Sequence, residues 1–274
     1  MSLHPVHGQD PLTALQKLEG SQLIVPVVSI GNTPQLATDL LIHTFAAKLV
    51  ARLDDIYLYP FASPVDYVDK PATGITSGLE IYYCEDQNLT ILQQRTPILP
   101  GLTKRFLSEL IVPFINMAKF SRVLVLQSND MGLREDKHAN HKYLLWSNQI
   151  TKIIETLQVS ESGVAVVRES TELDGVGKLV IEALEQQPSP TAKLAPAVSG
   201  SLSLNAQAHA SIDAAFLSMF VYEGDNSDDS KLLAAEALKV LNIQGPSKWT
   251  QPVSWRGVYG NKQVPSGLEF GVYA

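Results

Sequence analysis

The stretch from Gln22 to Ala47 constrains the fold more than any other part of this 274-residue chain. It begins with a short apolar run rich in β-branched residues, breaks at a polar turn that contains Gly31, and continues with apolar residues at helical spacing. An apolar run without polar alternation is typical of a strand that is covered on both faces, as in a parallel sheet. Asn32 or Thr33 can cap the helix, and Pro34 suits its first turn. We therefore predict a strand, a turn and a helix that begin an α/β domain.

The remaining pattern predicts a single α/β domain over residues 22–260, with a mixed sheet flanked by helices. Short β-rich runs predict strands at residues 56–59, 79–84, 89–95, 123–126 and 163–167. Four polar residues separate the second run from the third, so these two are predicted to form an antiparallel hairpin. Apolar residues at helical spacing predict helices at residues 102–119, 150–157, 171–186, 206–222 and 227–241. Pro113 is expected to kink or divide the first of these helices.

Three segments are expected to lie outside this regular structure. Residues 1–21 are predicted to be a mobile leader, in which residues 12–18 could add one helical turn. Residues 188–204 are rich in Pro, Ser and Ala with almost no charge, which is typical of a flexible surface loop. The chain ends in an irregular stretch, and residues 261–274 are predicted to be a C-terminal tail.

Composition and charge disfavour several classes of partner. The chain has 21 Lys plus Arg against 28 Asp plus Glu, and its net charge of -7 argues against broad binding to nucleic acid. Cys84 is the only cysteine, which suits a reducing compartment and allows no internal disulfide. No apolar run reaches the length that spans a membrane, and the N-terminus does not resemble a secretory signal. We expect a soluble protein of the cytoplasm, with the nucleus as a second location, and no membrane partner.

The catalytic and nucleotide-binding motifs that the chain partly resembles are all incomplete. Ser29 lies on a strand-to-helix turn, as a nucleophile elbow does, but Val27 stands where the G-x-S-x-G signature requires glycine. The segment around Gly175 and Gly177 fails the phosphate-loop pattern, because Glu172 replaces its first glycine and the Ser or Thr after the lysine is missing. We predict no catalytic and no cofactor-binding residues.

A metal site is considered at His138 and His141 with Asp136. Two histidines three positions apart in a charged loop usually face solvent, and no further His or Cys cluster completes a coordination shell. We predict no metal site.

Four aromatic residues in or near C-terminal loops allow two interpretations. Tyr222, Trp249, Trp255 and Tyr259 suit either a satellite core under an irregular tail or an interface anchored by aromatic side chains. The core interpretation is favoured, because isolated aromatic residues usually pack.

Five sequence blocks stand out when they are taken together in their order along the chain. They are Val27-Val28-Ser29-Ile30-Gly31-Asn32 with Gln35-Leu36 and Asp39-Leu40, then Gln94-Arg95-Thr96-Pro97, Tyr222-Glu223-Gly224-Asp225-Asn226, Pro252-Val253-Ser254-Trp255, and Val272-Tyr273-Ala274. In this order they resemble the proteasome assembly chaperone 2 family, and its fungal members most closely. The resemblance covers residues 22–126 and 206–274.

The resemblance implies a non-enzymatic assembly factor with an architecture like that of the nucleoside phosphorylases. Such a factor pairs with proteasome assembly chaperone 1, binds the α-ring of the 20S core particle, promotes ring formation and prevents premature binding of activators. The family's C-terminal motif, a hydrophobic residue, tyrosine and any residue, falls on Val272, Tyr273 and Ala274. In the family this tail inserts into a pocket between adjacent α subunits, where a lysine meets the terminal carboxylate.

A second hypothesis from another class is a hydrolase-like or phosphorylase-like enzyme that uses the Ser29 turn and the His138 loop. The two hypotheses differ in geometry. An enzyme needs Ser29 and a histidine within hydrogen-bond reach in one pocket, whereas a chaperone needs an exposed tail.

Overall fold

The computed structural model of the chain describes residues 2–138, 140–151, 163–186 and 212–256. In these residues nine strands form one mixed sheet in the order β1-β3-β6-β7-β2-β8-β11-β9-β10. The strands are β1 (Leu3–Pro5), β2 (Gln22–Pro26), β3 (Lys48–Leu53), β6 (Leu79–Cys84), β7 (Leu89–Gln94), β8 (Arg122–Asp130), β9 (Tyr143–Ser147), β10 (Val164–Val166) and β11 (Asp213–Val221). A small separate ribbon pairs β4 (Ala62–Pro64) with β5 (Ile75–Ser77).

The four central strands of the large sheet, β7, β2, β8 and β11, are parallel, and antiparallel strands adjoin them on both sides. Successive residues of these strands point to opposite faces. In β8, Val123 and Val125 join one apolar cluster, whereas Leu124 and Leu126 join the other. Both faces are therefore covered, which explains the apolar runs without alternation and confirms the prediction of a mixed α/β sheet flanked by helices.

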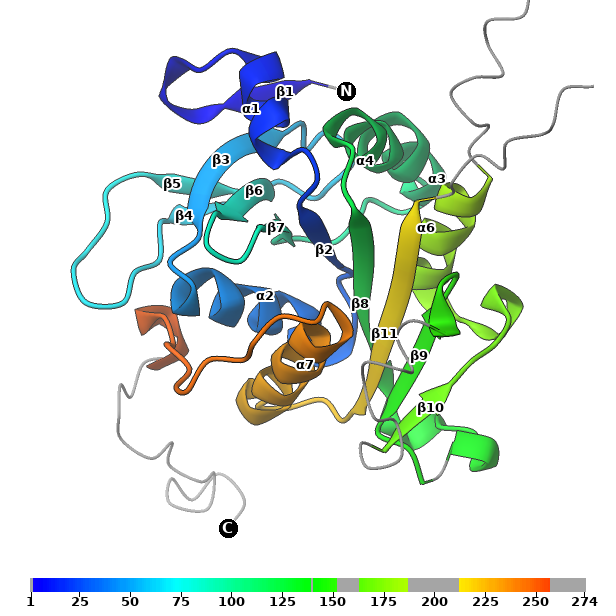
Figure 1. The fold of residues 1–274 in the computed structure, drawn as a ribbon. Coiled ribbons are helices and arrows are strands. Elements are labelled where there is room, and N and C mark those ends of the chain that lie inside the picture. Colours follow the sequence, from blue (N-terminus) through cyan, green and yellow to red (C-terminus); the bar gives the residue numbers. More distant parts are fainter. Residues whose placement is uncertain (1, 139, 152–162, 187–211, 257–274) are drawn as a thin grey trace, which may run out of the picture.

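The helices divide between these two faces (Figure 1). One face is covered by α2 (Thr33–Thr44) and α7 (Ser227–Val240), which pack against each other. The other is covered by α1 (Pro11–Leu18), by α3 (Thr103–Phe106) with α4 (Val112–Ala118), and by α6 (Gly175–Glu185). Short 3-10 turns occur at Val6–Gly8, Ile30–Asn32, Met131–Leu133, Asp136–His138, Ser170–Glu172 and Val253–Arg256.

The predicted helix over residues 102–119 exists but is divided as its proline suggests. A π-helical turn, Leu107–Ile111, lies between α3 and α4, and Pro113 stands in the first turn of α4. Proline lacks an amide donor, so the regular helical bond to the preceding turn cannot form, and a π-turn accommodates the gap. The hairpin of β6 and β7, the strand β10, the helix α6 and the helix α7 also agree with their predicted positions.

The structure differs from the prediction of a mobile leader over residues 1–21. Residues Leu3–Pro5 pair with β3 as an antiparallel edge strand, and α1 follows at Pro11–Leu18. Asp10 caps α1 by accepting the amide of Leu12 at 3.0 Å. Leu15 and Leu18 of α1 are buried, so apolar packing rather than sequence position decides the order of this segment.

Two predicted elements are wrong. Residues 56–59 were expected to be a strand, but only Leu58 forms an isolated bridge, to Ile98. The strand in this region is β3, which lies earlier in the chain. Residues 206–222 were expected to be a helix, but the described part of this range forms β11, which lies between β8 and β9. Its alanines favour a helix, but nearly the whole segment is buried between two other strands. This tertiary packing overrides the local helix propensity. The strand β9 was not predicted.

Several predictions fall outside the described residues. These are most of the helix predicted at residues 150–157, the flexible loop at 188–204, and the tail at 261–274 with Val272, Tyr273 and Ala274. In the described part of the chain no helix is long and apolar enough to cross a membrane.

Candidate functional site

The Ser29 turn lies at the carboxyl ends of β2 and β8, where open α/β sheets carry their ligand sites. Ser29 has extended backbone, and its hydroxyl donates to the carbonyl of Val27 at 2.9 Å. It also accepts the backbone amide of Ser128 at 3.0 Å. The hydroxyl of Ser128 in turn donates to the carbonyl of Ile30 at 2.6 Å. The two serines therefore join the ends of neighbouring strands, and among the described hydrogen bonds Ser29 has no histidine partner.

The glycines of the Gly175-Val176-Gly177 segment serve helix packing. Gly175 has φ +66°, and a Cβ atom there would lie 2.7 Å from the side-chain nitrogen of Gln127. The amide of Gly177 donates to Oε1 of Gln127 at 2.8 Å. Asn129 and Asp174 complete the cluster, with Asn129 Nδ2 at 3.0 Å from Asp174 Oδ1. The start of α6 is thus held against β8 by side chains of this protein, and no phosphate is needed to explain the glycines.

The described residues of the histidine loop likewise form no coordination site. The ring of His138 lies 6.4 Å from the ring of Phe220, centre to centre, and its partial burial lowers its pKa below the usual value. In the described residues no three side chains of His, Cys, Asp or Glu are grouped so that they could hold a metal ion.

The two blocks around Asp39 and Arg95 meet in a buried polar network between α2 and β7. Arg95 Nη1 donates to Asp39 Oδ2 at 2.6 Å. Only 17% of the Arg95 side chain and 13% of the Asp39 side chain are exposed. Gln93, which is fully buried, donates to Asp39 Oδ1 at 2.8 Å and to the carbonyl of Gln35 at 2.9 Å. Thr38 donates to Gln93 Oε1 at 2.9 Å. This network fixes the position of α2 on the sheet.

The blocks that contain Gly31 and Asn226 also meet. Gly31 has φ +65°, and a Cβ atom there would lie 2.2 Å from Asn226 Nδ2, so a side chain at position 31 cannot be accommodated without a shift. Asn226 precedes α7, and the sequence predicts that Asn226 or Ser227 caps this helix. The side chain of Asn226 instead donates to the Gly224 carbonyl at 3.1 Å, and Asp225 accepts the amide of Ser227 at 3.0 Å.

The fourth block anchors the long loop after β4. Ser254 bonds Asp66 through its backbone amide at 3.3 Å and through its hydroxyl, and the amide of Val253 donates to the carbonyl of Tyr67 at 2.8 Å. Trp249 and Trp255 are partly buried against the cluster beneath α2 and α7, which supports the satellite-core interpretation for them. Tyr222 is 64% exposed, and Tyr259 lies outside the described residues.

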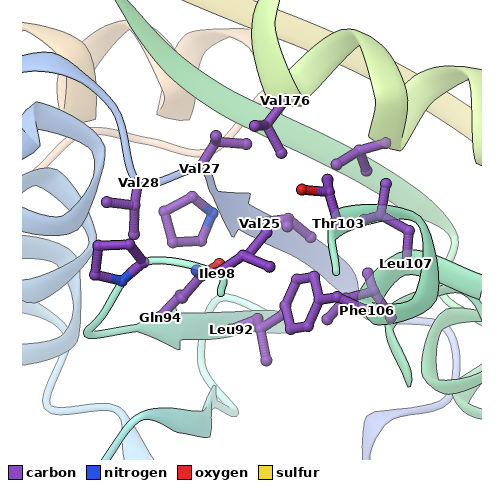
Figure 2. A pocket seen from close by; sticks show the side chains of 14 residues that line it. Val25, Val27, Val28, Leu92, Gln94, Ile98, Thr103, Phe106, Leu107 and Val176 are labelled. Atoms are coloured by element: carbon purple, nitrogen blue, oxygen red, sulfur yellow. The ribbon is translucent and has the colours of Figure 1, made fainter. Parts of the chain in front are cut away.

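An apolar cavity of about 180 Å³ adjoins the Ser29 turn between β2, β7, α3 and α6. Figure 2 shows Val25, Val27 and Phe106 among the side chains that surround it. This cavity was not predicted from the sequence, and neither were Gln93 and Gln127 as network residues. Glutamines inside otherwise apolar strands were the available signal, because a buried amide requires hydrogen-bond partners.

Comparisons with known proteins agree with the resemblance of the blocks. The model of the PAC2 family matches residues 23–241. Proteasome assembly chaperone 2 of Saccharomyces cerevisiae is 26% identical over 264 residues, with 88% of this chain and 95% of the yeast protein covered. Proteasome assembly chaperone 2 of Xenopus laevis is 27% identical over 259 residues, with 90% and 94% covered.

The fold is also similar to that of a solved structure. PbaA of Pyrococcus furiosus, an archaeal homolog of proteasome-assembly chaperone, matches with a TM-score of 0.57 and 16% identity, and 84% of each chain is covered. At this identity the match concerns the architecture alone.

Proposed function

Because the chain belongs to the PAC2 family, we propose that it is a non-enzymatic chaperone of proteasome assembly. The observation that carries this proposal is the near full-length similarity to proteasome assembly chaperone 2 of yeast and frog. The geometry of the Ser29 turn supports it, since the serine that a hydrolase would use donates its proton to a backbone carbonyl.

The proposed partners are proteasome assembly chaperone 1 and the α subunits of the 20S proteasome. In this proposal the chain forms a heterodimer with proteasome assembly chaperone 1 and binds the ring that the α subunits form. It thereby promotes ring formation and prevents premature binding of activators. The proposed location is the cytoplasm, with the nucleus as a second location. Support comes from the family, from the acidic charge, which disfavours nucleic acid, and from the single cysteine.

The proposed ring-binding residues are Val272, Tyr273 and Ala274. Val272 and the ring of Tyr273 would fill apolar space between two α subunits, and a pocket lysine would pair with the carboxylate of Ala274. A desolvated charge-assisted contact of this kind contributes about 1.5–3 kcal/mol, which is about ten- to a hundredfold in affinity.

The test uses the full chain with its heterodimer partner and purified α-rings in a pull-down. Deletion of residues 272–274, or addition of one residue after Ala274, should weaken ring binding by about ten- to a hundredfold and leave the heterodimer intact. The extended variant keeps every side chain and moves only the carboxylate. If it binds rings as tightly as the unaltered chain, the tail is not the docking element. If the unaltered heterodimer binds no α subunits at all, the chaperone function itself is wrong.

A further inference from the structure

The cavity between β2, β7, α3 and α6 has a closed apolar floor and a partly open mouth. Its floor is formed by buried side chains that include Val25, Leu92 and Phe106. Val28 and Val176 at its mouth are only half-buried. A molecule can therefore reach the cavity from solvent and lose most of its own contact with water there.

Two polar groups face this apolar space, the amide of Gln94 and the hydroxyl of Thr103 (Figure 2). Gln94 is 5% exposed, and its amide is held by a hydrogen bond from Nε2 to the carbonyl of Thr96 at 2.9 Å. Within the described part of the chain, neither Oε1 of Gln94 nor the hydroxyl of Thr103 has a hydrogen-bond partner. Figure 2 shows both side chains at the cavity, with the Thr103 hydroxyl directed inward. Thr103 is half-buried, and neither atom is among the fully buried unpaired groups, so water can reach both. A bound molecule can replace that water and use one acceptor and one hydroxyl.

The size and charge of the cavity limit what it can bind. An engineered apolar cavity of about 150 Å³ in another protein binds benzene, so about 180 Å³ is sufficient for one aromatic ring. No charged side chain is among the residues that line the cavity, and an ion would lose its hydration without gaining a counter-charge. The ligand must therefore be small and uncharged.

The position of the cavity is that of a ligand site rather than of a random packing gap. It lies at the carboxyl ends of the parallel strands β2 and β7, which is where open α/β sheets bind their ligands. Leu107 and Ile111, the two ends of the π-helical turn, belong to its wall, and π-turns are frequent at functional sites.

We propose that this cavity is a binding site for a small uncharged molecule with one ring and one hydroxyl-type group. The ring occupies the space between Val25, Val27 and Phe106, and the polar group donates to Oε1 of Gln94 and accepts from the hydroxyl of Thr103. This proposal does not depend on the chaperone function.

Two probes of nearly equal shape test the site, phenol and toluene, because only phenol carries the hydroxyl. Each is titrated into the full chain, and methyl NMR signals are followed. Saturable shifts are expected for Val27, Leu107 and Val180 at the cavity, with no shifts for Leu40 and Leu238 on the opposite face. The absence of saturable shifts at the cavity with both probes, or equal shifts on both faces, overturns the proposal.

Two variants of α6 test the place of binding. Val176→Phe puts a ring into the mouth and should weaken the binding of both probes by about tenfold or more, since the probe and the new ring compete for one space. Leu179→Phe introduces the same side chain on the same helix at a half-buried position that does not line the cavity, and it should leave binding within about twofold. Equal affinities of the two variants contradict the proposal.

Thr103→Val tests the polar contact with an isosteric change at a half-buried position. It should weaken phenol binding by about two- to tenfold and leave toluene binding unchanged, because one hydrogen bond is lost only for phenol. Gln94→Met gives a second test with the same expected pattern. If both variants change phenol and toluene binding equally, the assigned hydrogen bonds are wrong.

Discussion

The contact of α2 with β7 and the contact of α3 and α6 with β2 use different kinds of interaction, although both cover the same sheet. Under α2 a buried ion pair, Asp39 with Arg95, and the amide of Gln93 fix one relative position. Between α3 and α6 the walls are almost entirely apolar, and a cavity of about 180 Å³ remains. Hydrogen bonds have directions, whereas apolar contacts depend mainly on the area removed from water.

The α2 side is therefore held in one position by directional contacts, whereas the side of α3 and α6 contains unfilled space. The family blocks around Gly31, Asp39 and Arg95 gather on the α2 side, so their residues are explained by how α2 and α7 are positioned. The cavity side can accept a change in side-chain volume more easily, because space is already present.

Asp39→Ala should lower the free energy of unfolding by about 3–5 kcal/mol, because it leaves the mostly buried guanidinium of Arg95 without its counter-charge. Urea unfolding followed by circular dichroism measures this. Glu19→Ala provides the control. It removes an ion pair with Lys119 whose side chains are 51% and 67% exposed, and the expected change is below about 1 kcal/mol. Equal losses for the two variants would contradict the special role of the α2 network.

Gly31→Val should cost about 2–3 kcal/mol, because a β-branched residue is strained at φ +65° and its Cβ would meet Asn226. Differential scanning calorimetry of the folded chain gives the change. In the double variant Gly31→Ala with Asn226→Gly the clash is absent, so its loss of stability should be smaller than the sum of the losses of the two single variants. An unchanged unfolding midpoint for Gly31→Val would show that the backbone relaxes freely at this turn.

The local sequence pattern was sufficient to predict the elements whose apolar residues repeat with the period of their own secondary structure. In the β2 run, the hairpin and the helix α7, the pattern of apolar residues matches the pattern of burial. Gly31 has a positive φ, which is the backbone conformation that a glycine in a turn indicates. Pattern failed for β11 because its alanines suit a helix and a fully buried strand equally well, and only the neighbouring strands β8 and β9 decide. It also failed for β3, whose Lys48 and Arg52 obscure the apolar residues between them.

The contacts of the candidate site could be predicted only in part. The blocks identified Asp39 and Arg95 as notable, but the partner of each lies more than fifty positions away, and single residues do not reveal such a pairing. The cavity has no sequence signal at all, because it is the space that remains when β2, β7, α3 and α6 are assembled.

Paired volume changes sharpen the contrast between the two sides. Ala37→Val on α2 adds atoms at a fully buried position against the packed cluster and should destabilise the protein by about 1–3 kcal/mol. Val180→Ile on α6 adds one methylene group toward the cavity and should stabilise it by about 0.5–1 kcal/mol. Both are measured by urea unfolding. Destabilisation of similar size in both variants would show that the cavity side is as tightly packed as the α2 side.

The smallest expected effect is a pH dependence at His43, in the last turn of α2. Burial lowers the pKa of His43 below its ordinary value, against the opposing charges of Asp39 and Asp66, while the nearby Arg95 lowers it further. A histidine whose pKa is lower in the folded state binds its proton more tightly when unfolded, so its contribution to stability is complete above the unfolded pKa of about 6.5 and is lost as pH falls from there through the folded pKa. The free energy of unfolding should therefore decrease between pH 7.5 and 5.5 in the unaltered chain. His43→Gln keeps a polar side chain without this titration, and its stability should decrease less over the same interval. Parallel curves for the two proteins would mean that His43 is as easily protonated in the folded chain as in the unfolded one. Burial at the end of α2 would then not lower the pKa of His43.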